Sequence, residues 1–249
     1  MKVNKIIISQ AAPMDQTPYT ALREKYGVQI DFRPFFLIEP LSSREFRAQR
    51  LAILDYTAIV FSARHTIDAF FRLCDELRIK IPETMKYFCS TEAVALYLQK
   101  HIVFRKRKIF FGTGTPDSIV AQIGTKHKDE KFLITTNAAT SNDTMTKAFS
   151  SAGLEFTIAN FVKPVSQDLS DVDIHSYDVV VVYNPADLTS LQENFKEFKP
   201  EGIQFVTFGH GIVKAMEDNG YPIAIKAPTP EAPSVARALA LYLEKSVNE

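Results

Sequence analysis

The sequence predicts an α/β protein built from two Rossmann-like or flavodoxin-like parallel-sheet domains. Three observations support this fold class. Short apolar runs alternate with segments of helical period along the whole chain. Several of the runs are apolar without interruption, which is typical of a strand buried on both faces of a parallel sheet. Finally, the order strand, polar turn and helix recurs twice with similar spacing in each half, which indicates two related α/β units.

Ten runs predict the strands in chain order. They lie at residues 6–8, 28–32, 57–61, 85–89, 108–111, 131–135, 156–158, 177–183, 203–208 and 222–225. The longest, 177–183, contains four consecutive valines, and β-branched residues of this kind favour extended backbone. Alternation of these strands with helices predicts right-handed crossovers.

Helices are predicted between the strands from apolar periodicity and from start signals. Apolar side chains recur at intervals of three and four over residues 67–77 and 188–198, which places them on one helix face. Ser42 with Glu45 three residues later predicts a capping box. Asn184-Pro185 and Thr229-Pro230 each predict an N-cap followed by proline at the first helical position.

Two extended, proline-containing stretches, at about 33–40 and 161–168, predict two crossings between the domains. Domain 1 is then discontinuous and comprises residues 1–35 with 168–249, and domain 2 comprises residues 38–164. Ligands of open α/β sheets bind beyond the carboxyl ends of the strands. We therefore expect a cleft between the domains, formed by the turns that follow the strands.

Composition excludes several classes of protein. The chain has 249 residues, and its 29 basic and 29 acidic side chains cancel, whereas nucleic-acid binders usually carry a basic domain. No apolar run approaches the ~20 residues of a membrane helix, and the N-terminus lacks an export signal. We expect a cytoplasmic monomer that binds neither nucleic acid nor membrane. Cys74 and Cys89 lie in apolar patterns, so we expect buried free thiols.

The sequence lacks the familiar motifs for nucleotide binding and for metal binding. The turn 112–115 lacks the third glycine of a dinucleotide fingerprint, so it is either a plain strand-to-helix turn or a turn whose backbone N–H groups bind an anion. The five histidines show no metal-ligand spacing, so no metal is expected. His101 and His127 lie beside lysines and are predicted to be solvated. His65 and His210 occupy turns between strand and helix, where each could bind an anionic ligand or cap its own helix.

Several short stretches resemble motifs of the uroporphyrinogen-III synthase family. Residues 226–232, which precede the last predicted helix, are similar to the family's closing motif. Residues 60–67 resemble its Phe-Thr-Ser-x-Asn-Ala-Val turn, and residues 208–211 resemble its Gly-Pro-Thr-Thr turn. The stretch 82–98 is similar to the form found in Bacteroidetes-type members. The resemblance covers essentially the whole chain, and it implies that the two crossings at about 33–40 and 161–168 form a two-stranded linker between the domains.

This resemblance implies a cofactor-free lyase of haem biosynthesis that cyclises hydroxymethylbilane, a linear tetrapyrrole, with inversion of ring D and loss of water. The substrate carries eight carboxylates, which helix N-termini and hydroxyls would bind. Four turns are expected to present unpaired backbone N–H groups. The expected substrate-binding residues are Ser62, Arg64, His65, Ser90, Thr91, Asn184, Ala186, Gly209, His210 and Gly211. Ser62 and Thr91 are the candidates for a catalytic role.

Three departures from the family pattern support an alternative function. A frequent tyrosine near the second linker is replaced in the stretch 162–165, and two threonines are replaced by Gly211 and Ile212. A Ser-Pro-Ser-Gly turn is here Asn-Pro-Ala-Asp, and Asp187 would place a negative charge near a polycarboxylate. The alternative is a catalytically weak or inactive member that binds tetrapyrroles or another polycarboxylate. A two-lobed sugar or amino-acid receptor is disfavoured because an export signal is missing.

Overall fold

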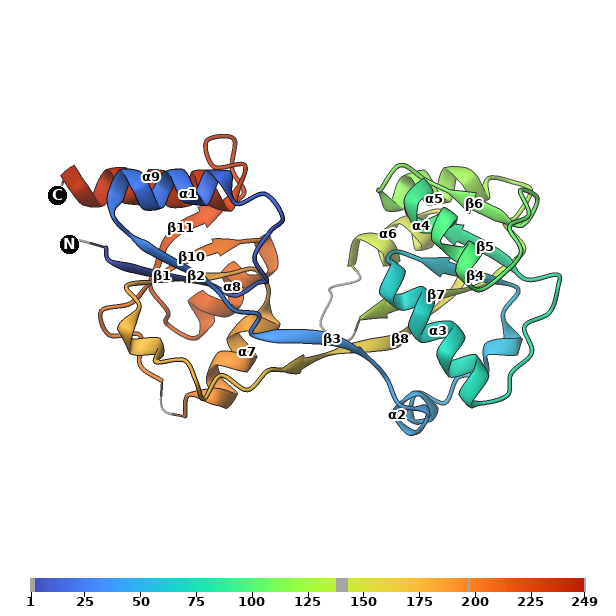
Figure 1. Cartoon of the computed structure of the whole chain (residues 1–249). Helices are drawn as coiled ribbons and strands as arrows, with labels where there is room; N and C mark the ends of the chain where they lie inside the picture. The colour runs from blue at the N-terminus through green and yellow to red at the C-terminus, as the bar shows by residue number, and fades with distance from the viewer. Residues whose placement is uncertain (1–2, 138–142, 197, 249) are drawn as a thin grey trace. The chain divides into compact units, whose positions relative to one another are not determined.

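The computed structural model describes residues 3–137, 143–196 and 198–248, without the side chains of Asp143, His210 and Asn248. The chain divides into two compact units (Figure 1). Unit 1 comprises residues 1–37 and 165–249, and unit 2 comprises residues 38–164. Each contains its own sheet, so the predicted fold class of two parallel-sheet α/β units is confirmed.

Unit 1 is built on a five-stranded sheet with the order β11-β10-β9-β1-β2. All its neighbouring strands are parallel. The strands are β1 (Lys5–Ile8), β2 (Gln29–Phe32), β9 (Val179–Val182), β10 (Gln204–Phe208) and β11 (Ile223–Ala227). The strand order reverses direction between β1 and β9, which is the topological switch point of a flavodoxin-like sheet.

Helices cover both faces of the unit 1 sheet (Figure 1). They are α1 (Thr17–Tyr26), α7 (Pro185–Asn194), α8 (His210–Asp218) and α9 (Val235–Asn248), with the short 3-10 helix η3 (Ile174–Ser176). Ile6 and Ile8 pack with α1 and α9, whereas Ile7 packs with α7 and α8. Because both faces are buried, the strands are apolar without alternation.

Unit 2 is built on a six-stranded sheet with the order β3-β8-β7-β4-β5-β6. The strands are β3 (Phe36–Pro40), β4 (Ala58–Phe61), β5 (Lys86–Cys89), β6 (Ile109–Phe111), β7 (Lys131–Asn137) and β8 (Glu155–Ser166). All neighbouring pairs from β8 to β6 are parallel. The order reverses between β4 and β7, as in a Rossmann half.

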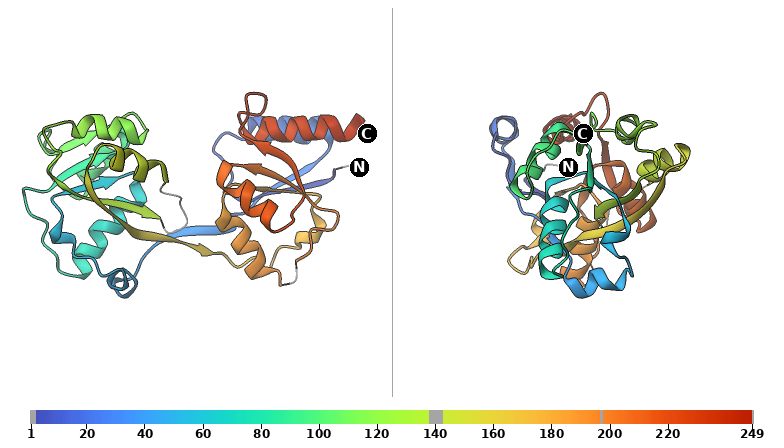
Figure 2. Two further views of the ribbon diagram at one scale, coloured as in Figure 1. Left: turned by 180° about the vertical axis from the view of Figure 1, so that it is seen from behind. Right: turned by 90° about the vertical axis from the view of Figure 1, so that its right-hand side faces the viewer.

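Helices also lie on both faces of the unit 2 sheet, as the views in Figure 2 show. They are α2 (Ser43–Ala48), α3 (Arg64–Glu76), α4 (Glu92–Tyr97), α5 (Pro116–Ile123) and α6 (Asp143–Ser151), with the 3-10 helices η1 (Ile53–Asp55) and η2 (Leu98–Lys100). The apolar stripe of α3 is buried, and so are the free thiols of Cys74 and Cys89, as predicted.

Strands β3 and β8 carry the chain between the units and are neighbours in one sheet (Figure 1). The backbone N–H of Leu41 donates to Phe161 O at 2.9 Å, and that of Gln167 donates to Phe35 O at 2.8 Å. These bonds place residue 41 opposite 161 and residue 35 opposite 167, so the two strands run in opposite directions. The stretches expected to be extended are therefore paired strands.

Two helix boundaries differ from the sequence prediction. The last helix begins at Val235 and not at Pro230, because Pro233 disfavours helical backbone at the residue before it. The Thr229 hydroxyl instead accepts the Ala232 N–H at 3.0 Å in a local turn. Helix α7 ends at Asn194, four residues before the predicted end. The Ser42–Glu45 capping box is present as predicted.

Candidate functional site

The four predicted turns lie at the carboxyl ends of parallel strands, two in each unit. In unit 2, residues 62–65 follow β4 and residues 90–91 follow β5. In unit 1, residues 184–187 follow β9 and residues 209–211 follow β10. Each turn leads into a helix whose N-terminus carries a partial positive charge. The four turns differ in whether side chains of the protein already accept hydrogen bonds from their backbone N–H groups.

A pocket of about 310 Å³ opens at the carboxyl edge of the unit 2 sheet. It lies where the strand order reverses between β4 and β7, the usual ligand position in such sheets. The residues around it are mostly small, hydroxyl-bearing or amide-bearing: Ser62, Ala63, His65, Thr66, Ile134, Thr135, Thr136, Asn137, Thr144 and Met145. The pocket therefore brings the predicted residues Ser62 and His65 together with the end of β7.

The N-terminus of α3 forms one wall of this pocket and carries no side-chain cap. Its N-cap residue is Ala63, whose methyl group cannot accept a hydrogen bond, and the helix continues for 13 residues. The Thr66 hydroxyl does not cap the helix either, because it donates to Ala63 O at 2.8 Å. The N–H groups of the first helical turn are therefore left for a ligand, and an anion fits them best.

His65 lines the pocket, whereas Arg64 lies outside it. Burial lowers the pKa of His65, and the nearby carboxylate of Asp68 offsets this only in part. The imidazole is therefore mostly neutral at pH 7, with one donor and one acceptor nitrogen. The Arg64 guanidinium lies over the ring of Tyr97, 5.5 Å from its centroid.

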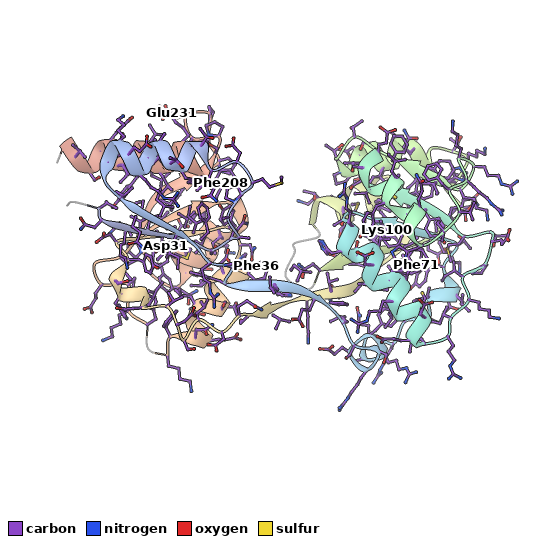
Figure 3. All side chains as sticks on the ribbon, viewed as in Figure 1. Asp31, Phe36, Phe71, Lys100, Phe208 and Glu231 are labelled. Atoms are coloured by element: carbon purple, nitrogen blue, oxygen red, sulfur yellow. The ribbon has the colours of Figure 1, made fainter. Side chains whose placement is uncertain are left out.

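Arg64 belongs to a polar cluster on the outside of α3. Asp68 accepts the Tyr97 hydroxyl at 2.7 Å and contacts His101 Nε2 at 2.8 Å. His101 stacks on Phe71, and Lys100 donates to the Tyr97 oxygen at 3.1 Å; Phe71 and Lys100 are labelled in Figure 3. This cluster joins η2 to α3, and His101 is exposed, as the sequence predicts, while contacting Asp68 and Phe71.

His127 differs from its prediction as a solvated residue. Its side chain is 6% exposed and lies against the rings of Phe88 and Phe110. The flanking lysines misled the prediction because the segment after α5 folds back onto the sheet. Burial, together with the positive charge of Lys86, lowers the pKa of His127.

Ser90 and Thr91 serve the fold of the turns. Ser90 Oγ donates to Ser62 O at 3.0 Å, which ties the turn after β5 to the turn after β4. The Thr91 hydroxyl accepts the Val94 N–H and caps α4. By contrast, Ser62 Oγ makes no hydrogen bond to any residue that the structure describes. Of the two candidates for a catalytic role, only Ser62 therefore presents an uncommitted hydroxyl.

The expectation of unpaired N–H groups is wrong for the turn 184–187. Asp187 Oδ2 accepts the N–H groups of Tyr183 and Asn184 at 2.8 and 3.1 Å. Asn184 Oδ1 accepts the Ala186 N–H at 2.8 Å, and residue 185 is a proline without a donor. This capping box occupies the donors that were predicted to bind substrate, so α7 begins with a closed N-terminus.

The turn 209–211 keeps an open helix start. The N-cap of α8 is Gly209, which has no side chain to cap the helix, and its own N–H donates to Ala227 O at 2.8 Å. A Cβ atom on Gly209 would lie 2.6 Å from Tyr183 O, whereas one on Gly211 would have no neighbour within 4 Å. Open space above Gly211 thus gives a ligand access to α8. The side chain of His210, also predicted to bind substrate, lies outside the described part of the structure.

Sequence reasoning missed the contribution of β7 to the pocket. Thr136 and Asn137 end this strand, and Thr144 follows on α6. The signal was present, because an apolar run that leads into Thr-Thr-Asn is the same pattern that identified the other turns. The segment 138–142, which completes this connection, lies outside the described residues.

Two further site types find no support among the described residues. The turn 112–115 closes on itself, since Ser118 Oγ accepts the Thr113 N–H at 2.9 Å and donates to Thr115 O at 2.6 Å. Within the described ranges, no three His, Cys, Asp or Glu side chains group as metal ligands. In the same ranges, no helix has the length and apolar character needed to cross a membrane.

Comparison with known proteins places this geometry in a family. A family model described as uroporphyrinogen-III synthase HemD matches residues 17–237. The uroporphyrinogen-III synthetase of Helicobacter pylori has a similar structure, with a TM-score of 0.57, 14% identity, and coverage of 97% of this chain and 99% of that one. A mutant uroporphyrinogen III synthase from the extremely thermophilic bacterium Thermus thermophilus gives a TM-score of 0.51 at 12% identity, with the same coverage. A search of curated protein sequences found no match. The match to most of the chain shows that it belongs to the uroporphyrinogen-III synthase family, whose members are cyclising hydro-lyases of tetrapyrrole biosynthesis.

Proposed function

We propose that this chain converts hydroxymethylbilane to uroporphyrinogen III, closing the macrocycle with inversion of ring D and loss of water. The observation that carries the proposal is the uncapped N-terminus of α3 beside a pocket of hydroxyl and amide side chains, in a chain of this family. A carboxylate only accepts hydrogen bonds, and this wall supplies N–H and O–H donors. The match in chemistry favours a polycarboxylate as the ligand.

The size of the pocket indicates which part of the substrate it holds. At about 310 Å³ it lies at the small end of the roughly 300–1,000 Å³ typical of ligand pockets. It suits one pyrrole ring with its acid side chains better than a whole tetrapyrrole. We propose that other carboxylates bind the open start of α8 at residues 209–211, where Gly211 permits close approach.

Catalysis in this proposal is mainly electrostatic. The C–O bond of the substrate's hydroxymethyl group breaks and the hydroxyl leaves as water, so fixed donors near it lower the barrier. Ser62 is the proposed catalytic contact, because its hydroxyl makes no hydrogen bond to a described residue and lines the pocket. His65 adds a neutral hydrogen-bonding group, and no cofactor is needed for this reaction.

A coupled assay tests the proposal directly. Freshly generated hydroxymethylbilane is incubated with the purified chain, and the oxidised products are separated into isomers I and III. Isomer III above the blank without protein supports the activity. Isomer I alone, at the rate of the blank, rejects it.

The closed turn 184–187 favours the alternative that the chain binds tetrapyrroles with little turnover. The side chains of Asn184 and Asp187 occupy donors that a substrate carboxylate would otherwise use. Calorimetry with uroporphyrin III separates the two cases. Binding without formation of isomer III supports the alternative, whereas an absence of binding removes it and leaves the isomer assay to decide the activity.

We also propose that the chain acts as a cytoplasmic monomer without nucleic acid. Its balanced charge supports the absence of a polyanionic macromolecular partner. Its two free, buried thiols suit a reducing compartment. Light scattering after size-exclusion chromatography checks the monomer, for which the expected mass is 28.1 kDa.

A further inference from the structure

Asp187 is a buried acidic side chain that has no cationic partner among the described residues. It lies in the first turn of α7 and is 1% exposed. One carboxylate oxygen, Oδ2, accepts the N–H groups of Tyr183 and Asn184. Nothing in this arrangement neutralises a full negative charge, and burying an uncompensated charge is unfavourable.

The second oxygen of Asp187 lies near the hydroxyl of Ser9. Oδ1 is buried and makes no hydrogen bond to a described group, and the same holds for the hydroxyl of Ser9, which is 2% exposed. Ser9 follows β1 and Asp187 follows β9, and these two strands are neighbours at the switch point of unit 1. Ser9 lies close enough to lower the pKa of Asp187, yet burial dominates and raises that pKa to about 6.

The groups around Asp187 are uncharged at physiological pH, so its own ionisation changes with pH. Tyr183 is the titratable neighbour at the end of β9, and burial, Tyr19 on α1 and Asp187 itself all raise the pKa of its phenol. Both tyrosines are therefore neutral at physiological pH. The remaining influences on Asp187 are the two backbone N–H groups and the Ser9 hydroxyl, all uncharged.

Asp187 contacts the turn 209–211 of unit 1 indirectly, through the backbone of Tyr183. It holds the backbone of Tyr183, and the Tyr183 carbonyl oxygen is the atom that a Cβ on Gly209 would strike at 2.6 Å. Gly209 therefore packs directly on the backbone that Asp187 fixes. Phe208, which precedes it and is labelled in Figure 3, has its ring 5.8 Å from that of Tyr183. The Asp187 carboxylate thus binds the N–H of the residue whose carbonyl oxygen packs against Gly209, the N-cap of α8.

We propose that Asp187 sets the affinity of the 209–211 turn for anionic ligands through its own charge. When neutral, it leaves the positive end of α8 available to a carboxylate. When ionised, it opposes the ligand, so anion binding at this edge weakens as the pH rises. The proposal rests on the proposed function in one respect, namely that the ligand at this turn is a polycarboxylate.

The first test compares binding of uroporphyrin III to the wild type and to Asp187→Asn at pH 5.5 and pH 8. The asparagine keeps an oxygen for the two N–H groups and presents an uncharged amide to Ser9. We expect similar affinities at pH 5.5 and about tenfold tighter binding by the variant at pH 8. The matched control is Asp218→Asn, which removes the same charge from the exposed end of α8. Its affinity for uroporphyrin III, divided by that of the wild type, should stay near one at both pH values. If the same affinity ratio for Asp187→Asn does not change with pH, the proposal is overturned.

The second test needs no ligand. Since the pKa of Asp187 in the folded protein lies above its unfolded value near 3.8, its ionisation destabilises the fold as pH rises from about 4 to about 6. In urea unfolding, the free energy of unfolding of Asp187→Asn should rise relative to that of the wild type between pH 4 and pH 6. The difference should persist at pH 8. A variant less stable than the wild type at pH 8 would mean that the carboxylate is a favourable cap, and the proposal fails. If the wild type binds uroporphyrin III at neither pH, the proposed binding of a polycarboxylate at the 209–211 turn fails, and with it the proposed effect of Asp187, while the isomer-resolved assay still decides the proposed function.

Discussion

The hydroxyl of Ser90 donates a 3.0 Å hydrogen bond to the backbone oxygen of Ser62, so a side chain beyond β5 fixes the turn beyond β4. This turn leads into the uncapped start of α3 and lines the pocket of unit 2. Ser90 therefore positions donors without itself lining the pocket. Its influence on function passes through the backbone of its neighbour.

Replacing Ser90 by alanine should lower kcat/KM by roughly tenfold or less, the effect of about one ordinary hydrogen bond. Threonine retains the hydroxyl, so Ser90→Thr should restore most of the loss. The measurement is the isomer-resolved assay, with thermal unfolding in parallel. Equal loss in the alanine and threonine variants would show that the 3.0 Å bond is unimportant for turnover.

Closing the N-terminus of α3 should stabilise the protein and weaken its activity at the same time. Ala63 has the extended backbone of an N-cap, with φ −151° and ψ 157°, but no acceptor. Ala63→Thr supplies a hydroxyl to the first-turn N–H groups, and such caps contribute about 1 kcal/mol of stability. We expect a higher Tm and a fall in kcat/KM of about tenfold, because the donors are then occupied.

Ala63→Val is the matched control, since valine has the shape of threonine without the hydroxyl. Its effect on kcat/KM measures the steric contribution alone. If the two variants lose activity equally, the open N–H groups of α3 do not bind the substrate.

Much of the fold follows from local patterns that the sequence contains. Uninterrupted apolar runs are possible only where both faces of a strand are covered, which is why the four valines of β9 already indicate a buried parallel strand. The Ser42–Glu45 capping box is equally local. Helix α9 was placed too early because Thr229-Pro230 has the same local signature as a true cap. The second proline at 233 and Ser234, whose hydroxyl accepts the Arg237 N–H at 3.2 Å, decide the real start.

The state of the backbone donors could not be read from the sequence. Asn184 and Gly209 both stand between strand and helix, yet the donors of one turn are closed and those of the other are open. Asn184 is predicted as an N-cap from the sequence, but the return of the Asp187 side chain to the N–H groups of Tyr183 and Asn184, which closes the turn, requires coordinates. His127 is a similar case, since its burial comes from packing against Phe88 and Phe110 across the sheet.

His127 should make the protein sensitive to mild acid. Burial lowers its pKa below the 6.5 of a free imidazole, so the folded state binds this proton less well than the unfolded state. The stability that this provides is complete above pH 6.5 and is lost as pH falls below it. We expect His127→Leu to lose less unfolding free energy than the wild type between pH 8 and pH 5, measured by urea unfolding at both values. His175→Leu, at a more exposed histidine, serves as the control and should follow the wild type.

The two glycines at the start of α8 should separate folding from function. Gly209 has φ +152°, and a Cβ there would lie 2.6 Å from Tyr183 O, so Gly209→Ala should lower stability by roughly 1–3 kcal/mol. Gly211 has open space, so Gly211→Leu should fold with an unchanged Tm while its side chain covers the N-terminus of α8. Because backbone donors survive the loss of a single hydroxyl, we expect Gly211→Leu to reduce kcat/KM far more than Ser62→Ala, whose effect should be about tenfold or less. Thermal unfolding and the isomer-resolved assay on the three variants give the comparison. If Gly211→Leu keeps full activity and Ser62→Ala loses all of it, the backbone donors do not bind the substrate. Catalysis would then depend on the Ser62 hydroxyl.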